Sequence, residues 1–248
     1  MERIENIGFG DMKLVQDTEE FCYGVDAVIL ADFAYSFCSG FKKAVDLGTG
    51  TGIVPFILSH KNRDAEFVGV DVQESSIRMA EKGSLLNSLQ ERISFVRRDV
   101  SDTEDGFFEK LEADMVTCNP PYFAKGGGIP SENMSRFIAR HETSSGIEDF
   151  VKAAASILKG KGHLFIVHRP SRLVDIFCAC RKYGLEPKDI RYVKPRSGEV
   201  PNIVLIHCKA GGGRELRIMN ELCVYNDDGS YSDEIQRIYE RRDNTAVL

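Results

Sequence analysis

The sequence predicts an α/β fold built around a mostly parallel, seven-stranded sheet. The first observation is a set of short apolar runs typical of buried strands, which alternate with segments of helical spacing. The second is a glycine-rich turn between the first of these strands and a helix. The third is a pair of β-rich runs at 189–194 and 202–208, separated only by a short turn. Because a short turn pairs neighbouring strands antiparallel, we expect the sheet to end in an antiparallel hairpin.

The predicted elements follow one another along most of the chain. The strands are expected at 44–48, 66–71, 93–100, 113–118, 163–168, 189–194 and 202–208. The helices are expected at 25–33, 53–58, 75–86, 147–158 and 169–183. Apolar runs of four to eight residues bounded by glycine, proline or polar clusters favour the strands, and spacings of three and four residues favour the helices.

The length of 248 residues and an apolar content of 42% are enough for one sizeable core. We therefore expect one domain: residues 1–43 form its flank or lid, residues 44–210 its main body and residues 211–248 its tail. The sequence contains no apolar run of 18 residues, and its N-terminus lacks the apolar stretch of a signal peptide. These features predict a cytoplasmic protein that does not enter the membrane.

The cysteines and histidines give little support for a metal site or a disulfide framework. The seven cysteines are odd in number and include no Cys-x-x-Cys pair, so we interpret them as reduced, mostly packed thiols. The five histidines are scattered, and no two have the spacing of metal ligands on one helix face. We predict that the protein has no metal.

Positive charge is concentrated in residues 159–217, although the whole chain has a formal net charge of −6. This segment carries 13 basic and 5 acidic side chains, an excess of +8, whereas residues 218–248 carry 3 basic and 7 acidic ones. Such an excess in an otherwise acidic chain is typical of a surface that binds a polyanion such as RNA. The candidate phosphate contacts are Arg169, Arg172, Arg191, Lys194 and Arg196. The alternative is a solvated basic face without a partner.

The segment before the first strand of the sheet has the pattern of a flank over a ligand pocket. Its apolar spacing predicts the helix at 25–33, and Gly24 marks the turn that enters this helix. The segment is too short to form a domain. Its candidate polar contacts to a ligand are Gln16, Tyr23 and Asp26.

The turn after the first strand has the spacing Gly-x-Gly-x-Gly, at Gly48, Gly50 and Gly52. Such a turn lets a ligand approach the backbone and the N–H groups of the following helix. A dinucleotide fingerprint would place a glycine at position 53, where this chain has Ile53. Asp46 would repel a pyrophosphate but attract an ammonium or sulfonium group. This combination favours S-adenosylmethionine over NAD.

The second and third strands each end in a carboxylate that suits an adenosine ligand. Asp71, followed by Val72, can accept hydrogen bonds from both ribose hydroxyls. Asp99, followed by Val100, can accept a hydrogen bond from the exocyclic amine of the adenine. The alternatives are a helix cap for the first carboxylate and a surface ion pair with the preceding arginines for the second.

The tetrapeptide after the strand at 113–118 carries the predicted chemistry. The prolines Pro120 and Pro121 stiffen the backbone and remove two N–H donors, so carbonyl acceptors stand without competing donors beside them. The side-chain oxygen of Asn119 and the carbonyl of Pro120 can accept the two hydrogens of a planar NH₂ group, while Tyr122 stacks on the attached ring. The alternative is a rigid turn after a strand.

Taken in order, these motifs resemble the class I S-adenosylmethionine-dependent methyltransferases that act on amino groups. Nearly the whole chain resembles one branch, the bacterial adenine-N6 methyltransferases that act on a valine tRNA next to its anticodon. The stretches that resemble this branch are 16–33, 139–142, 194–196, 202–205 and 222–239. The resemblance implies a Rossmann-like fold, S-adenosylmethionine as cofactor with S-adenosylhomocysteine as product, and adenosine 37 of this tRNA as substrate. Lys125, Arg140 and His141 are then further candidate RNA contacts.

The mechanism implied by this resemblance is direct methyl transfer from the cofactor to the amine, without a strong base. Hydrogen bonds from the amine to Asn119 and Pro120 favour the more tetrahedral nitrogen of the transition state. Other substrates stay open: a guanine N2 of ribosomal RNA, an adenine of DNA or a protein glutamine. The 43 residues before the main domain are too few for the helical substrate domain of the glutamine enzymes. A nicotinamide oxidoreductase and a non-catalytic nucleotide- or RNA-binding module are the remaining alternatives.

Overall fold

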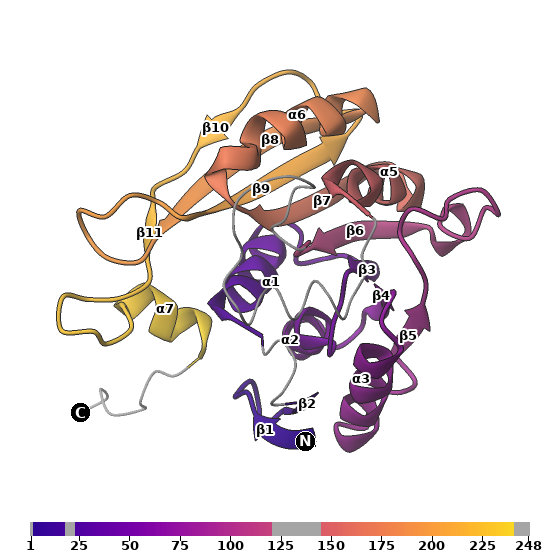
Figure 1. The fold of residues 1–248 in the computed structure, drawn as a ribbon, viewed down its shortest axis with the longest axis horizontal. Coiled ribbons are helices and arrows are strands. Elements are labelled where there is room, and N and C mark those ends of the chain that lie inside the picture. The colour runs from indigo at the N-terminus through magenta and orange to yellow at the C-terminus, as the bar shows by residue number, and fades with distance from the viewer. Residues whose placement is uncertain (1, 18–22, 121–144, 241–248) are drawn as a thin grey trace.

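The computed structural model describes residues 2–17, 23–120 and 145–240, and its main feature is a nine-stranded sheet in this part of the chain (Figure 1). In spatial order the strands are β10 (Arg217–Ile218), β8 (Leu185–Lys194), β9 (Ile203–Ala210), β7 (Leu158–His168), β6 (Ala113–Cys118), β3 (Lys43–Leu47), β4 (Glu66–Asp71) and β5 (Ile93–Arg97). An additional strand, β11 (Leu222–Cys223), pairs with β8 beyond β10.

Seven of these strands are the predicted ones, and their pairing confirms a mostly parallel sheet that ends in an antiparallel hairpin. β5, β4, β3, β6 and β7 pair in parallel, whereas β9 pairs antiparallel with both β7 and β8. All the long strands except β9 therefore end at the same side of the sheet, which we call the carboxyl edge. The sheet exceeds seven strands because β10 and β11, of two residues each, add to β8. Strands of two residues are too short to show a periodicity in sequence.

Helices cover both faces of the sheet (Figure 1). α1 (Val25–Phe37) and α2 (Ile53–Lys61) contribute to one apolar core, and α5 (Ile147–Ile157) and α6 (Leu173–Lys182) to the other. α3 (Glu74–Leu86) packs mainly against β5 and against the N-terminal strand at Lys13–Asp17. The two short 3₁₀ helices are η1 (Glu109–Leu111) and η2 (Pro170–Arg172). The predicted helices are confirmed, and α1 is four residues longer at its end than the apolar spacing indicated.

The central strands are apolar because both of their faces are buried. In β7, Phe165 faces the core formed with α1, whereas Leu164 and Ile166 face the core formed with α5 and α6. Neighbouring β3 and β6 alternate in the same way. A buried polar side chain in β3 or β6 is therefore unusual, and the two there, Asp46 and Thr117, lie where these strands approach the carboxyl edge.

The N-terminal flank contains a hairpin that the sequence did not predict. β1 (Glu2–Asn6) pairs antiparallel with β2 (Lys13–Asp17), outside the main sheet. The connecting loop buries Phe9, whose ring lies 6.1 Å from that of His60 and 6.3 Å from that of Tyr239. The loop places Phe9 and Asp11 at positive φ, a conformation that their residue types do not signal.

The segment at 211–240 packs along the β8 side of the molecule. After β10 and β11 the chain makes a turn closed by a bridge between Tyr225 and Tyr231. α7 (Asp233–Ile238) follows and begins with the Ser232 hydroxyl as its N-cap. At its end the Glu240 carboxylate accepts from the His60 ring at 3.0 Å. In the part of the chain that the structure describes, no helix has the length and apolarity needed to span a membrane.

Candidate cofactor and substrate site

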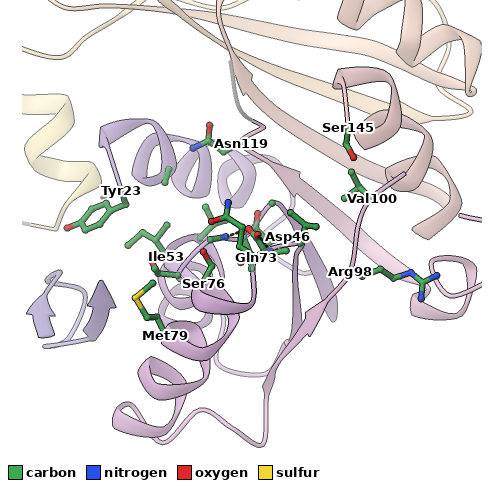
Figure 2. A pocket seen from close by; sticks show the side chains of 18 of the residues that line it. Tyr23, Asp46, Ile53, Gln73, Ser76, Met79, Arg98, Val100, Asn119 and Ser145 are labelled. Carbon is green, nitrogen blue, oxygen red and sulfur yellow. Dashed lines mark hydrogen bonds between the residues drawn. The ribbon is translucent and has the colours of Figure 1, made fainter. Parts of the chain in front are cut away.

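A cavity of about 1180 Å³, including space open to solvent, lies at the carboxyl edge. Figure 2 shows Tyr23 and Met79 toward one end of the cavity, Asp46 and Gln73 near its middle, and Ser145 toward its other end. The predicted cofactor residues that line it are Tyr23, Asp46, Gly48, Gly50, Asp71, Val72, Asp99, Val100 and Asn119. Two other predicted cofactor residues, Gln16 and Gly52, are not among the residues that line the cavity.

The glycine turn forms the floor of the cavity, and its conformation explains the glycines. Gly50 has φ +53, and a Cβ built there would meet nothing within 4 Å, so its backbone faces open space. Gly52 has φ +87, and a Cβ there would lie 2.8 Å from the Phe95 ring. One glycine thus opens the backbone to a ligand, and the other lets the turn pack against β5.

Asp71 holds the glycine turn and the start of α3 together. Its Oδ2 accepts from the Gly50 N–H at 2.8 Å, and its Oδ1 accepts from the Gln73 N–H at 2.9 Å. The N-cap of α3 is Gln73, so the alternative interpretation of Asp71 as that cap is wrong. Each carboxylate oxygen has a second lone pair that can accept from a ribose hydroxyl.

Asp46 is a buried carboxyl group at the end of β3. Its side chain lines the cavity although the residue is only 4% exposed, and its Oδ1 accepts from the Thr117 hydroxyl at 2.6 Å. Burial raises the pKa of Asp46 to about 7, the Thr117 hydrogen bond opposes this rise, and the negative charge of Asp71 adds to it. A cationic ligand in the cavity would favour the ionised carboxylate.

Asp99 lies two residues beyond β5 and is held by hydroxyl and backbone donors. Its Oδ1 accepts from Ser145 Oγ at 2.5 Å and from the N–H and hydroxyl of Ser101, both at 2.8 Å. Partial burial tends to raise the pKa of Asp99, but the hydrogen bonds from Ser145 and Ser101 outweigh it and hold the pKa below its ordinary value. The preceding arginines pair elsewhere, Arg97 with Glu74 and Arg98 with Asp102. The alternative of a surface ion pair is therefore wrong.

The predicted acceptor tetrapeptide begins at the carboxyl end of β6, as expected. Asn119 lines the cavity and Pro120 is buried behind it. Figure 2 shows the Asn119 amide on the side of the cavity opposite the Ser76 and Met79 side chains. Pro121 and Tyr122 lie outside the described residues, so their roles stay predictions.

The N-terminal flank reaches the cavity through Tyr23 and through Asp17 at the end of β2. Gln16 supports Tyr23 from behind: its Oε1 accepts from the Tyr23 N–H at 2.9 Å, and the residue is 2% exposed. Asp26 lies in the first turn of α1, outside the cavity lining. Within the described part of the flank, Tyr23 is thus the predicted contact that meets the ligand space.

Two of the predicted RNA contacts are paired with carboxylates of the C-terminal segment. The Arg191 guanidinium lies 2.8 Å from Glu234, and the Lys194 ammonium lies 2.6 Å from Glu221. The positive segment and the acidic segment that follows it are therefore packed together, and each pair cancels charge. Both pairs lie beside β8, near the carboxyl edge.

The remaining predicted RNA contacts near this edge have partners closer in sequence. Arg172 pairs with Asp175 at 2.6 Å, and Arg196 pairs with Glu199 at 3.5 Å. Arg169 is exposed, and its guanidinium donates to a backbone carbonyl of the β8–β9 turn at 3.4 Å. Lys125, Arg140 and His141 lie outside the described residues.

Several cavity residues were not among the predicted ones. Asp17, Ser76, Met79 and Ser145 all line the cavity. Ser76 and Met79 are three residues apart on α3, a spacing that indicates a shared face but not which ligand the face meets. Ser145 precedes α5 and reaches Asp99 across 46 residues of sequence, a contact that no local pattern signals.

The methyltransferase small domain family matches the chain over residues 28–175, more than half of its length. The chain belongs to this family. The matched region includes the glycine turn, the cavity residues Asp46, Asp71 and Asp99, and Asn119. The family assignment confirms that the protein is a methyltransferase.

Individual proteins resemble the chain over most of its length. The tRNA1(Val) (adenine(37)-N6)-methyltransferase of Aeromonas salmonicida is 25% identical, with 94% of each chain covered. A crystal structure of a predicted O-methyltransferase from Agrobacterium tumefaciens has a TM-score of 0.67 and 21% identity, covering 87% of this chain and 95% of that one. The 16S rRNA N2 G1207 methyltransferase of T. thermophilus, solved with AdoMet and guanosine, has a TM-score of 0.57 and 18% identity, covering 84% of this chain and 50% of that one. These structures confirm the predicted Rossmann-like methyltransferase fold.

The cavity fits S-adenosylmethionine, the cofactor of this class of methyltransferase. Open backbone at Gly50 can accept a ligand at close range, Asp71 offers acceptors for ribose hydroxyls, and Asp99 offers one for an adenine amine. The Asp46 carboxylate supplies negative charge at a place where a dinucleotide would need a hydrogen-bond donor to its pyrophosphate. In the described part of the chain, no three His, Cys, Asp or Glu side chains are grouped to hold a metal ion.

Proposed function

We propose that this protein uses S-adenosylmethionine to methylate the N6 amine of an adenine in tRNA, at adenosine 37 of tRNA1(Val). The observation that carries the proposal is Asn119 at the end of β6, beside a cavity in which Asp46, Asp71 and Asp99 suit the cofactor. The relatives that cover most of the chain support the same substrate through their names. A tRNA substrate also agrees with the predicted cytoplasmic location.

The cofactor supplies an electrophilic methyl group on a sulfonium. The protein binds and orients the amine, with the Asn119 side-chain oxygen accepting one N6 hydrogen and the Pro120 carbonyl accepting the other. These hydrogen bonds weaken the conjugation of the N6 lone pair with the purine and favour the tetrahedral nitrogen of the transition state. Alignment of the amine with the methyl group contributes the rest, and the nitrogen then loses its proton to solvent.

Adenine reaches this site only if it leaves its stack in the anticodon loop, which costs a few kcal/mol. Tyr122 is proposed to recover part of this energy by stacking on the extruded base. Arg169, Arg172, Lys194 and Arg196 lie near the edge that carries Asn119, where they can approach the phosphates around the target.

A single incubation tests the proposal. Bulk tRNA, the protein and methyl-labelled S-adenosylmethionine are combined, and the nucleosides are digested and analysed by mass spectrometry. We expect labelled N6-methyladenosine, formed roughly tenfold to a thousandfold more slowly when Asn119→Ala protein replaces the wild type. Calorimetry in parallel should show binding of S-adenosylmethionine and none of NAD, and Asp71→Ala should weaken the former roughly tenfold or more through loss of charged acceptors. Tight NAD binding would overturn the cofactor.

Methylation of a guanine N2 is the second candidate function. It is favoured by the likeness to the structure of the T. thermophilus enzyme and by Asn119, since this acceptor fits any planar exocyclic amine. A parallel incubation with ribosomal RNA separates the two candidates, because N2-methylguanosine and N6-methyladenosine differ in mass. Labelled N2-methylguanosine from ribosomal RNA, with unlabelled tRNA adenosine, would assign the protein to the second function.

A further inference from the structure

One short hydrogen bond joins the strand of the glycine turn to the strand of Asn119. Thr117 of β6 and Asp46 of β3 are register partners, and the Thr117 hydroxyl lies 2.6 Å from Asp46 Oδ1. Thr117 is fully buried and Asp46 is 4% exposed. Asp46 lies two residues before Gly48, and Thr117 lies two residues before Asn119. The bond therefore links the end of β3, which leads into the glycine turn, to the end of β6, which leads into Asn119.

The bond also determines how the Asp46 carboxylate is presented to the cavity. Thr117 occupies Oδ1, so the carboxyl plane is held by a β-branched side chain that has little freedom in a strand. The carboxylate meets the cavity beside the glycine turn, as Figure 2 shows for Asp46. A hydroxyl that donates to a carboxylate favours its ionised form.

Apart from the Thr117 and Thr49 hydroxyls, which favour the ionised form, the surroundings of Asp46 oppose ionisation. Burial disfavours the charged form most, and Asp71 of β4 adds a second negative charge at the same edge. Cys118, next to Thr117, has a pKa raised well above its ordinary value by burial, so it is a neutral thiol. Neither neighbour supplies a positive charge. The Thr117 hydroxyl thus acts against burial and against Asp71.

We propose that Thr117 is a positioning residue that keeps Asp46 oriented and ionised for the positively charged methionine end of S-adenosylmethionine. The inference rests on the proposed cofactor but goes beyond it, because it assigns a role to a residue that does not line the cavity. Binding of the charged cofactor should consequently be linked to the ionisation of Asp46, whereas binding of an uncharged adenosine fragment should not.

The experiment compares two probes at three pH values. Affinities for S-adenosylmethionine and for 5′-methylthioadenosine, which lacks both the sulfonium and the amino acid, are measured by calorimetry at pH 5, 6 and 7. In this range the α-ammonium of the cofactor stays mostly charged. The variants are Thr117→Val, which keeps the shape and removes the hydroxyl, and Thr117→Ser, which keeps the hydroxyl. Ser59→Ala is the control, because Ser59 is a buried hydroxyl bonded to a helix carbonyl outside the cavity.

We expect the wild-type affinity for S-adenosylmethionine to rise several-fold per pH unit, and Thr117→Ser and Ser59→Ala to follow the same profile. Loss of one charge-assisted hydrogen bond moves the ionisation of Asp46 up by about one pH unit. Thr117→Val should therefore bind S-adenosylmethionine roughly tenfold more weakly at pH 6. Its affinity for 5′-methylthioadenosine should stay within about twofold of the wild type, since this probe lacks the group that faces Asp46.

The outcomes separate this inference from the proposed function. A wild-type pH profile in Thr117→Val, or an equal loss for both probes, would overturn the positioning role and leave Thr117 as a structural contact. If the wild type binds no S-adenosylmethionine at any pH, the proposed cofactor itself fails. If Thr117→Val is poorly folded, Asp46→Asn provides the second measurement: its profile should be flat between pH 5 and 7, and a profile that still rises would overturn the inference.

Discussion

The two charged regions at the carboxyl edge are stabilised in opposite ways. In the cavity, neutral donors hold the carboxylates: the Gly50 and Gln73 N–H groups for Asp71, and hydroxyls for Asp46 and Asp99. Beside β8, carboxylates hold the basic side chains that the sequence marks as RNA contacts. A neutral donor orients a charged group without cancelling its charge, whereas an ion pair cancels it. The carboxylates of the cavity therefore remain charged and available to a ligand. In the basic region, which is Arg191 and Lys194 beside β8, the positive charge becomes available only when the ion pairs open.

This difference also determines which features the sequence could predict. The cavity residues follow strand ends, so that local patterns at Gly48, Asp71 and Asn119 indicate a shared edge. The basic region depends on contacts across long stretches of sequence: Arg191 meets Glu234 across 43 residues. A count of charges finds the excess in 159–217 but not the partners that neutralise it.

The missed elements have the same explanation. The β1–β2 hairpin turns through Phe9 and Asp11 at positive φ beside Gly8 and Gly10, and β10 and β11 form only because β8 offers an edge. Likewise, Ser145 and Thr117 are ordinary residues whose roles arise from Asp99 and Asp46. Helices and strands with a period were predictable, and contacts made by tertiary packing were not.

The largest effect should come from the reactive end of the cavity. Asn119→Ala removes an acceptor that matters most as the amine becomes tetrahedral, so turnover should fall roughly tenfold to a thousandfold. Cofactor affinity should stay nearly unchanged, because the carboxylates that hold the cofactor are intact. Single-turnover methylation of tRNA and calorimetry measure the two quantities. Wild-type turnover in this variant would reduce the tetrapeptide to a rigid turn.

The second test asks whether the cavity carries an unfavourable charge. The pKa of Asp46 rises from 3.8 to about 7 on folding, so ionised Asp46 destabilises the ligand-free protein. This penalty is absent below about pH 4, grows between pH 4 and 7, and is complete above pH 7, where it reaches at most about 4 kcal/mol. Asp46→Asn should therefore unfold at a higher temperature than the wild type at pH 8, with a difference that shrinks toward pH 4.

Thermal unfolding at pH 4, 6 and 8 measures this difference. Asp71→Asn is the comparison, because Asp71 receives two backbone N–H bonds that an amide oxygen replaces only in part, so we expect it to destabilise the protein. If the unfolding temperatures of Asp46→Asn and the wild type differ by the same amount at all three pH values, ionisation of Asp46 does not destabilise the folded protein.

The third test releases cations in the basic region. Glu221→Gln and Glu234→Gln remove the carboxylates that pair with Lys194 and Arg191. If the freed cations reach phosphates, tRNA affinity should rise several-fold, and the log–log slope against salt should steepen by roughly 0.7 to 0.9 for each. Glu112→Gln is the matched control, since it makes the same charge change before β6, at the opposite edge of the sheet. Equal gains in all three variants would indicate net charge alone.

The smallest effect should come from removing a cation that is already paired. This effect tests most directly whether the basic region, unlike the cavity, has its charge cancelled by ion pairs. Lys194→Ala alone should weaken tRNA binding by less than about threefold, because surface ion pairs are exchanged at little net free energy. In the Glu221→Gln background the same substitution should remove the whole gain that the released ammonium brings, and the salt slope should return to the wild-type value. Filter binding at four salt concentrations completes this double-mutant cycle. Additive effects would mean that Lys194 contacts RNA while it is still paired with Glu221. The cavity and the basic region would then differ in the groups that hold their charged side chains, but the charge of both would be available to a ligand.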